Sequence, residues 1–379
     1  MIYFDNASTS KNKPIEVINA FNYYISEVGV SPGRGSYSLG IQASRMLYQS
    51  RKTVAQFFGS LNPENIVFTK NSTEAINLYF NGFLKKGDHV LISAYEHNSV
   101  LRPIHSLKEK GIIDYTILPD EAIYNPEQFL KNYIKKNTVI IAVTLASNLT
   151  GQIVFNPLIS KVAHRHNLVV FVDASQGGGK KLVNMQNDNV DVIAFTGHKD
   201  LLALPGVGGL CSKNSFEISP LIQGGTGIHG DEYINPKAYP EAYEAGTLNM
   251  PAIWSLKNSM DYINEHFDEI KSKEKKLLEM LIGHLKSDAA FQLYNVQYDR
   301  VPTFCFNLKN VVSSEVVKYL DGQGVCVRGG IHCAILAHEH IGTVKNGAVR
   351  VSINASNTEE EVIEFINIIG EMKNAFGVL

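Results

Sequence analysis

Short apolar runs rich in β-branched residues alternate with longer segments of helical periodicity up to about residue 250. Strands buried on both faces of a parallel sheet have this almost wholly apolar character. We predict seven strands: Asn65–Thr69, His89–Ser93, Asp114–Leu118, Val139–Leu145, Leu168–Val172, Val192–Phe195 and Gly208–Ser212. Helices are predicted between them, for example at Ser72–Phe83 and Ser99–Lys110. This alternation favours an α/β domain with a doubly wound, mainly parallel sheet.

The pattern changes after Met250. Two long helices are predicted at Pro251–Phe267 and Ile270–Ser287, followed by short strands at Thr303–Leu308 and Ala348–Ile353. A final amphipathic helix is predicted from Thr358, where a polar cap precedes three acids that favour the positive end of a helix dipole. We therefore predict a large domain over residues 16–250 and a smaller α+β domain made of residues 1–15 and 251–379.

Composition and charge narrow the class of protein. Hydrophobic residues make up 44% of the 379 residues, and the net charge is only −2, without a basic tract. Nucleic acid and membrane surfaces are therefore not expected partners. The first residues lack the pattern of a secretory signal, and no apolar run is long enough to span a bilayer. The four cysteines have no CxxC or metal-like spacing, so we expect reduced thiols, a cytoplasmic location and no metal site.

Polar residues follow several predicted strands, at the edge where doubly wound sheets bind ligands. Ser72 and Thr73 lie where a strand passes into a helix, which is typical of an anion site and also of an ordinary helix cap. Asp173 follows Leu168–Val172. A carboxylate there could pair with the protonated ring nitrogen of pyridoxal phosphate, or it could only cap the next helix.

Two further segments carry candidate nucleophiles. Lys199 follows the strand Val192–Phe195, and the apolar, glycine-rich stretch after it argues against an ordinary surface lysine. An amine in such a setting suits a Schiff base, with Thr196 and His198 as phosphate donors. Cys333 is predicted in a glycine-containing loop that is flexible and free to swing. Arg328 and His332 beside it favour a thiolate, although a buried structural thiol is the alternative.

The order of the motifs resembles that of the class V aminotransferase superfamily over essentially the whole chain, and within it the branch of cysteine desulfurases and selenocysteine lyases. The motifs are Asp5–Thr9, Asn71–Asn77, Glu96–Ser99, Ser147–Gly151, Asp173–Gln176, Thr196–Lys199, Gly246–Asn249 and Arg328–Ala334. The resemblance implies the fold type I architecture of pyridoxal phosphate enzymes and a homodimer with its active sites at the subunit interface. The sequence differs from the best-known desulfurases after Cys333, where His338 and His340 occur.

The resemblance also implies a role for each matching residue. Lys199 would bind the cofactor covalently and act as base, Asp173 would pair with the ring nitrogen, and His97 would stack on the ring. The remaining cofactor contacts would be Gln176 at the ring hydroxyl and Ser72, Thr73, Thr196, His198 and, from the other subunit, Thr247 at the phosphate. Asn148 and Arg350 would hold the substrate carboxylate, with Arg328 as the next candidate, and Arg34 would line the entrance.

The implied reaction converts L-cysteine to L-alanine and leaves a persulfide on Cys333 for an acceptor protein or thiol. The alternatives are a selenocysteine lyase acting on L-selenocysteine, or another β-eliminating lyase with the same cofactor. An aminotransferase would have no use for the Cys333 thiol. A catalytically idle scaffold that binds a sulfur carrier would not need Lys199 and Asp173, and both are present.

Overall fold

The computed structural model describes residues 1–33, 35–228 and 230–378. Its largest sheet has seven strands in the order β2-β8-β7-β6-β5-β3-β4. Strands β7, β6, β5, β3 and β4 run parallel, whereas β8 is antiparallel to both β7 and β2. The bounds are β2 (Ile66–Thr69), β3 (Asp88–Ser93), β4 (Ile113–Leu118), β5 (Thr138–Thr144), β6 (Val169–Asp173), β7 (Val192–Thr196) and β8 (Gly208–Ser212).

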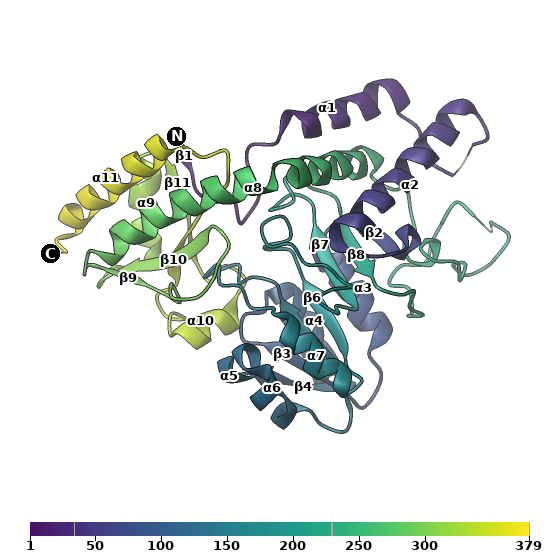
Figure 1. The fold of residues 1–379 in the computed structure, drawn as a ribbon, viewed down its shortest axis with the longest axis horizontal. Coiled ribbons are helices and arrows are strands. Elements are labelled where there is room, and N and C mark those ends of the chain that lie inside the picture. The colour runs from purple at the N-terminus through teal and green to yellow at the C-terminus, as the bar shows by residue number, and fades with distance from the viewer. Residues whose placement is uncertain (34, 229, 379) are drawn as a thin grey trace.

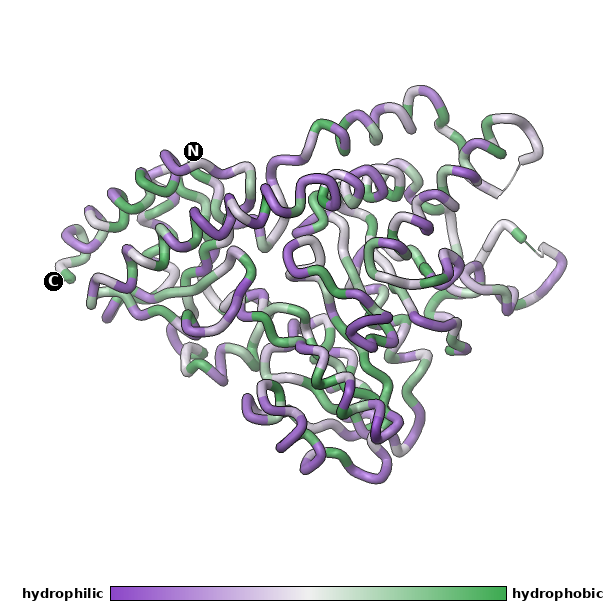
Figure 2. The backbone as a smooth tube through the Cα atoms, in the orientation of Figure 1, coloured by the Kyte–Doolittle hydropathy of each residue, from purple (hydrophilic) through white to green (hydrophobic). Residues whose placement is uncertain are grey.

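Helices cover both faces of this sheet (Figure 1). Along β6, Val170 and Val172 pack into one apolar cluster, whereas Phe171 between them packs into the cluster on the opposite face. Hydrophobic colour accordingly gathers in the central strands (Figure 2). In the described part of the chain, no helix is long and apolar enough to cross a membrane. The helices before residue 250 are α1 (Ile15–Tyr23), η1 (Tyr24–Val28), α2 (Ser38–Phe58), η2 (Pro63–Asn65), α3 (Ser72–Phe83), α4 (Asn98–Glu109), α5 (Asp120–Tyr124), α6 (Pro126–Phe129), η3 (Leu130–Tyr133), α7 (Pro157–Arg165) and η4 (Glu241–Tyr243).

The C-terminal region forms a second body around its own apolar cluster, which also takes in Ile2 and Phe4. Its antiparallel sheet has the order β12-β13-β10-β9, and β1 pairs in parallel with β11. The strands are β1 (Ile2–Tyr3), β9 (Phe291–Leu293), β10 (Thr303–Leu308), β11 (Val325–Cys326), β12 (Arg328–Gly330) and β13 (Ala348–Ser352). The helices are α9 (Ser313–Gly322), α10 (Ile335–Ile341) and α11 (Glu359–Phe376), the last with a capping box between Thr358 and Glu361.

One long helix, α8 (Met250–Lys286), joins the two bodies (Figure 1). Its first half packs on the large sheet through Ile253 and Leu256, and its second half packs in the C-terminal cluster through Leu277 and Leu281. The backbone leaves helical geometry at His266, where φ is −110° and ψ is 15°. The two helices predicted here are therefore one helix with a kink, and the predicted break between Phe267 and Ile270 lies just after that kink.

The predicted elements match the observed ones closely. β8, β10 and α3 have the predicted bounds, and the other predicted strands are shifted by one residue at one or both ends. Buried apolar runs mark strands well because both faces of the sheet are covered. The predicted division at residue 250 stays a prediction, since α8 belongs to both clusters.

Candidate functional site

The candidate site begins where two neighbouring parallel strands end. β6 ends at Asp173 and β7 ends at Thr196, and Asp173 is paired with Ala194 in the sheet register. Helix α3 starts at Ser72, whose hydroxyl lies 3.4 Å from Asp173 Oδ1. Because the carboxyl ends of parallel strands meet at one edge, residues from distant parts of the sequence converge here.

Asp173 is a buried carboxylate with one oxygen already engaged. Its Oδ1 accepts hydrogen bonds from the Ser175 amide at 3.0 Å and the Ser175 hydroxyl at 2.5 Å. Burial raises the pKa of Asp173, and the Ser175 hydrogen bonds oppose that rise. All the hydrogen bonds it accepts from described residues go to Oδ1, so Oδ2 can pair with a cation.

Lys199 lies in the turn after β7, and its amine interacts electrostatically with Asp173. Burial lowers the pKa of Lys199, and the charge of Arg350 acts in the same direction, whereas Asp173 raises it. A lysine whose neutral form is favoured in this way is suited to act as a nucleophile or base. The structure therefore brings together the two residues on which the sequence prediction rests.

His97 stands at the N-terminus of α4, where its ring acts as the helix cap. Nδ1 accepts a hydrogen bond from the Ser99 amide at 3.1 Å and lies 2.9 Å from the Ser99 hydroxyl. Burial lowers the pKa of His97 to about 3, and the charge of Lys199 contributes to that shift. The ring is therefore neutral, with its proton on Nε2, and it can present an uncharged face to a ligand.

The predicted phosphate donors differ in their surroundings. Ser72 and Thr196 are buried, and the Thr196 hydroxyl has no hydrogen-bond partner among the described residues. Thr73 is exposed at the start of α3. The carbonyl of His198 accepts hydrogen bonds from the N-terminal segment, and burial lowers the pKa of its ring to about 4. An unpartnered buried hydroxyl is costly, so Thr196 marks a place where a ligand acceptor is missing.

Gln176 and Asn148 are both engaged within the chain. Gln176 donates to the Ala7 carbonyl at 2.7 Å, and Asn148 donates through Nδ2 to the His332 carbonyl at 2.7 Å. The Asn148 side-chain oxygen is buried and has no partner among the described residues. The roles predicted for these two amides, at the ring hydroxyl and the substrate carboxylate, stay predictions.

Two arginines contact the hydroxyl of Ser8. Arg328 on β12 and Arg350 on β13 are directly opposite each other in the antiparallel register, so their side chains leave the sheet on one face. Arg350 Nη2 lies 2.6 Å from Asp5 Oδ1 and 2.8 Å from the Ser8 hydroxyl, and Arg328 lies 3.3 Å from the same hydroxyl. Only Arg350 is paired with the Asp5 carboxylate, whereas Arg328 reaches a neutral hydroxyl, so the cluster keeps an excess positive charge suited to an anion.

Cys333 lies in a tight segment between β12 and α10, and the structure corrects the expectation of a freely swinging loop. Gly329 and Gly330 belong to β12 and pair with β13. The carbonyl of Cys333 accepts a hydrogen bond from the Asn98 amide at 2.8 Å, next to His97. The Cys333 segment is therefore tied to the large domain at the site itself.

The other cysteines have different surroundings. Cys211 and Cys305 are fully buried, and burial raises the pKa of both thiols, to about 12 for Cys305. Cys326 is half-buried in β11. Because thiolates are the reactive form, the two buried thiols are poor nucleophiles.

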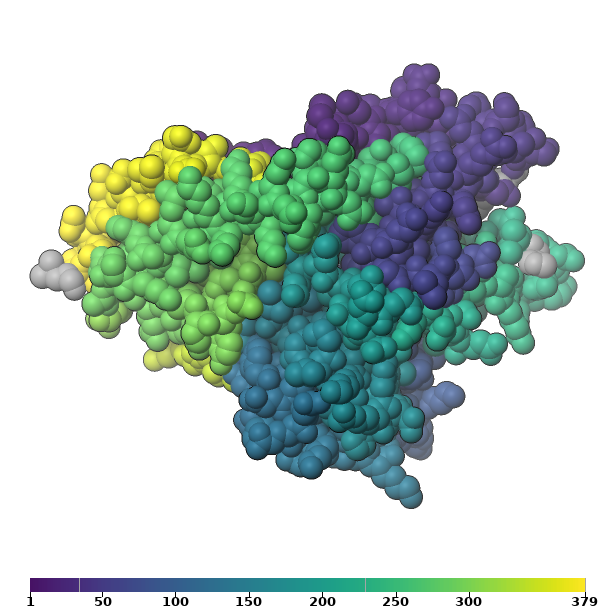
Figure 3. Space-filling view, in the orientation of Figure 1, coloured from purple at the N-terminus to yellow at the C-terminus, as the bar shows by residue number. Residues whose placement is uncertain are grey.

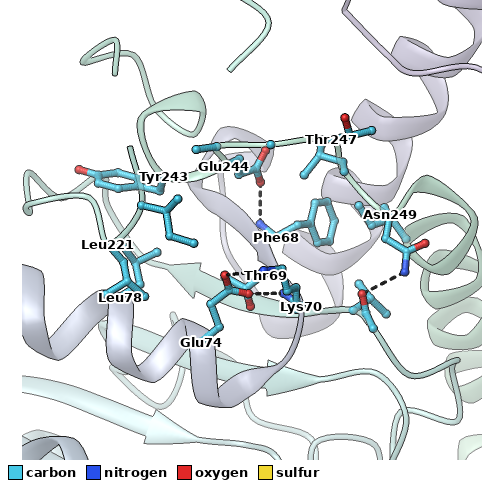
Figure 4. Close-up of a pocket in the computed structure, with 17 residues that line it drawn as sticks. Phe68, Thr69, Lys70, Glu74, Leu78, Leu221, Tyr243, Glu244, Thr247 and Asn249 are labelled. Carbon is cyan, nitrogen blue, oxygen red and sulfur yellow. Dashed lines mark hydrogen bonds and ion pairs between the residues drawn. The ribbon is translucent and has the colours of Figure 1, made fainter. Parts of the chain in front are cut away.

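Thr247 lies away from this cluster, on a cavity of about 320 Å³ that also involves Lys70, Glu74 and Asn249 (Figure 4). Its side chain is exposed. The loop before it is anchored because Glu244 is paired with the buried Arg51 at 2.5 Å. Arg34, predicted at the entrance, lies outside the described residues. The described residues contain no group of three or more His, Cys, Asp or Glu side chains that could hold a metal ion.

The sequence reasoning gave no role to Asp5, Ser8 and Glu96, although all three lie in the motifs on which the resemblance rests. Asp5 and Ser8 hold Arg350. Glu96 is fully buried beside His97, and burial raises its pKa to about 8. Their motifs were the available signal, but Arg350 lies too far from Asp5 and Ser8 in sequence to be paired with them by spacing.

Two features define the fold type I class of pyridoxal phosphate enzymes. One is the mainly parallel seven-stranded sheet with an attached α+β body, and the other is a lysine and an aspartate at adjoining strand ends. The chain belongs to the class V aminotransferase family, whose model matches residues 2–365.

Three proteins similar to this chain are described as cysteine desulfurases or probable cysteine desulfurases. A probable cysteine desulfurase of Methanothermobacter thermautotrophicus is 34% identical, over 98% of this chain and 93% of its own length. A probable cysteine desulfurase of Pyrococcus abyssi is 32% identical, over 98% of this chain and 94% of its own. The apo structure of a cysteine desulfurase from Thermococcus onnurineus NA1 superimposes with a TM-score of 0.89 at 30% identity, covering 99% of this chain and 95% of that one.

Proposed function

We propose that this protein is a cysteine desulfurase that binds pyridoxal phosphate at Lys199 and moves the sulfur of L-cysteine to the thiol of Cys333. The similarity to proteins of that description over nearly the full chain supports the proposal. The chemistry of the site supports it independently, in three parts: the cofactor contacts, the carboxylate contacts and the thiol.

The donor set fits pyridoxal phosphate. Asp173 has a free carboxylate oxygen for a protonated ring nitrogen, and Thr196 has an unpartnered buried hydroxyl for a phosphate oxygen. When bound, the cofactor would supply an electron sink for the bond-breaking steps. Asp173 would hold the ring-nitrogen proton, His97 would offer its neutral ring for stacking, and the Lys199 amine would bind the cofactor and remove the proton from the substrate Cα.

The excess positive charge at Arg328 and Arg350 suits the carboxylate of an amino-acid substrate. Arg350 is almost completely buried, and its Nε has no partner among the described residues. A guanidinium with donors left over in a fixed fork can bind a carboxylate with directional hydrogen bonds. Asp5 would keep that fork oriented when the substrate is absent.

The observation that carries the proposal is the attachment of the Cys333 segment to the ring site. The amide of Asn98, next to His97, binds the Cys333 carbonyl, and Asn148 binds the carbonyl of His332. In the reaction the Cys333 thiolate would attack the substrate sulfur and form an S–S bond as the C–S bond breaks. The products balance as L-alanine and a persulfide on Cys333.

The test is Cys333→Ser, with Cys326→Ser as the matched control. Cys333→Ser should still bind the cofactor and L-cysteine but should accumulate no protein-bound persulfide, and alanine formation should fall on the order of a hundredfold. Cys326→Ser should behave like the parent. If Cys333→Ser released alanine from cysteine as fast as the parent, Cys333 would not be the sulfur acceptor, and pyruvate and sulfide in place of alanine would identify a β-eliminating lyase.

The attachment of the cofactor has its own test. Borohydride reduction of the holoenzyme followed by mass spectrometry should place the pyridoxyl group on Lys199. A group found on Lys180 or Lys181, in the neighbouring glycine-rich turn, would contradict the assignment.

A homodimer is part of the proposal. Exposed apolar side chains lie on α2 and on the segment around residues 221–234, including Ile41, Tyr48, Ile222 and Ile234. Figure 3 shows these two regions on the same side of the molecule. Exposed apolar patches mark interfaces, and a second subunit there would bring the exposed Thr247 toward a phosphate. Light scattering should give a dimer.

The location and the sulfur acceptor also belong to the proposal. A cytoplasmic location follows from the chemistry, because the Cys333 thiol must be reduced in order to receive sulfur. The acceptor would be a protein or small-molecule thiol that takes the outer sulfur from the Cys333 persulfide.

A further inference from the structure

Three buried side chains, His332, His338 and Thr343, form a chain of hydrogen bonds next to Cys333. The His332 ring lies between the Arg328 carbonyl, 3.0 Å from Nε2, and His338 Nε2, 3.4 Å from Nδ1. His338 Nδ1 lies 2.7 Å from the Thr343 hydroxyl. The two imidazole rings are nearly parallel, with 5.7 Å between their centroids and an angle of 8° between their planes. His338 is fully buried, and His332 and Thr343 are nearly so.

With both rings neutral, the Arg328 carbonyl fixes one direction for the hydrogen bonds of this chain. The Arg328 carbonyl can only accept, so His332 donates from Nε2 and a neutral His332 must accept at Nδ1. His338 then donates from Nε2 to His332, and its own Nδ1 accepts from the Thr343 hydroxyl. Both rings are neutral in this arrangement, in agreement with burial lowering the pKa of His332 to about 3 and of His338 to about 4.

The chain spans a strained part of the backbone. His332 and Cys333 both have left-handed conformations, with φ of 54° and 55°, which non-glycine residues seldom adopt. Such a conformation persists only where surrounding contacts hold it. Arg328 precedes the strained residues and Thr343 follows α10, so the hydrogen-bonded histidines connect the two ends of the segment that carries the thiol.

We propose that His338, acting through His332 and together with Thr343, is a positioning residue that holds the Cys333 thiol at the attack position. This inference rests on the proposed function, in which Cys333 receives the sulfur. None of the three side chains needs to touch the substrate. Their effect is on the backbone of residues 332 and 333, and through it on the direction in which the thiol points.

The same helix provides a matched control. His340 is two residues from His338 on α10 but is half-exposed, and its Nε2 lies 3.1 Å from Asp120 Oδ2. It therefore contacts the large domain at the surface and takes no part in the chain to His332. A change at His340 tests whether any loss of a histidine from α10 disturbs the thiol.

The experiment compares His338→Leu, His338→Gln, Thr343→Val and the control His340→Gln as holoenzymes. Three quantities are measured: the dissociation constant of L-cysteine from its effect on the cofactor spectrum, the first-turnover rate of persulfide formation, and the rate of Cys333 alkylation by iodoacetamide. His338→Leu should form persulfide about 10- to 100-fold more slowly, because a small displacement of a reacting atom is costly. The dissociation constant should stay that of the parent, since the carboxylate and cofactor contacts are untouched.

Rescue separates positioning from general damage. Gln can still donate a hydrogen bond to His332, so His338→Gln should recover most of the rate, and His340→Gln should match the parent. Thr343→Val should show a smaller loss in the rate of persulfide formation, and this variant is the test if His338→Leu does not fold. If both variants fold, parent-like rates of persulfide formation and alkylation in Thr343→Val and His338→Leu would overturn the inference. If His338→Leu does not fold, parent-like rates in Thr343→Val alone would overturn it. A parent that forms no persulfide on Cys333 would instead overturn the proposed function, and the alkylation rates would still report whether His338 positions the thiol.

Discussion

The lysine–aspartate region and the Cys333 segment face the same site but are built differently. Asp173, Thr196 and Lys199 stand at or just after the ends of β6 and β7, two central parallel strands whose backbones are paired along their length. Cys333 stands in a turn between β12 and α10, held by side chains and single backbone contacts from distant segments. One half of the site is positioned by the sheet and the other by individual hydrogen bonds.

This difference predicts different responses to substitution. A side chain at the end of a central strand can be exchanged without moving its neighbours, so the effect reports the lost chemical group. In the Cys333 segment a single lost hydrogen bond releases strained backbone, so substitutions outside direct reach of the substrate should affect the reaction.

The largest effect is expected at Asp173. Asp173→Ala removes the carboxylate that would hold the ring-nitrogen proton, and activity should fall on the order of a thousandfold with weaker cofactor binding. Because β6 is a central strand, the fold should survive, as circular dichroism would show. Near-normal turnover of Asp173→Ala would mean that another acid takes this part, and the role assigned to the strand end would be wrong.

The next effect is expected at Arg350, which belongs to the C-terminal body. Arg350→Ala should keep bound cofactor but lose about 2 kcal/mol or more in kcat/KM for L-cysteine, mostly through KM. Arg328→Ala is the comparison, and its loss should be smaller because its contact with Ser8 is longer and it is less buried. Equal losses would indicate that the two arginines share the carboxylate.

Thr196→Val tests the half of the site that the sheet positions. The Thr196 hydroxyl is buried without a partner among the described residues, so replacing it with a methyl group should leave the cofactor-free protein as stable or slightly more stable. Cofactor affinity should nevertheless fall by about 1–2 kcal/mol, since a phosphate contact is lost. Thermal unfolding with and without cofactor measures both the stability and the affinity. A lower stability of the cofactor-free variant would show that Thr196 has a structural partner.

The smallest effect on activity is expected at Glu96, next to His97, where the substitution changes the pH dependence of stability instead. Its pKa is raised from 4.5 to about 8 by burial, so the folded state favours the protonated acid. An acid whose pKa is higher in the folded state than in the unfolded state destabilises the fold as pH rises through that interval. Glu96→Gln should therefore remove a loss of stability on the order of 3 kcal/mol between pH 5 and pH 8.

Urea unfolding of parent and variant at those two pH values measures this change. The exposed Glu364→Gln, on α11, should show the pH dependence of the parent. An unchanged pH dependence in Glu96→Gln would mean that Glu96 is ionised in the folded protein.

Much of the fold and of the candidate site could be predicted from the sequence alone. The buried strands are short apolar runs, and their alternation with helices predicts the mainly parallel sheet, because a strand covered on both faces has no polar positions. Once the strands are located, the positions of Asp173, Thr196 and Lys199 at one edge follow, since parallel strands end on the same side. The bounds of β8 and β10 could be predicted because every residue in these two strands is buried.

Only the tertiary structure decided the rest. Asp5 and Arg350, or Asn98 and Cys333, are partners separated by hundreds of residues, and no local periodicity records such a pairing. The glycines before Cys333 indicated a flexible loop, yet they pair in β12 because β13 lies beside them. Hydrophobic periodicity reflects which face of an element is buried, whereas the polar contacts that hold Cys333 depend on how two separately packed bodies meet.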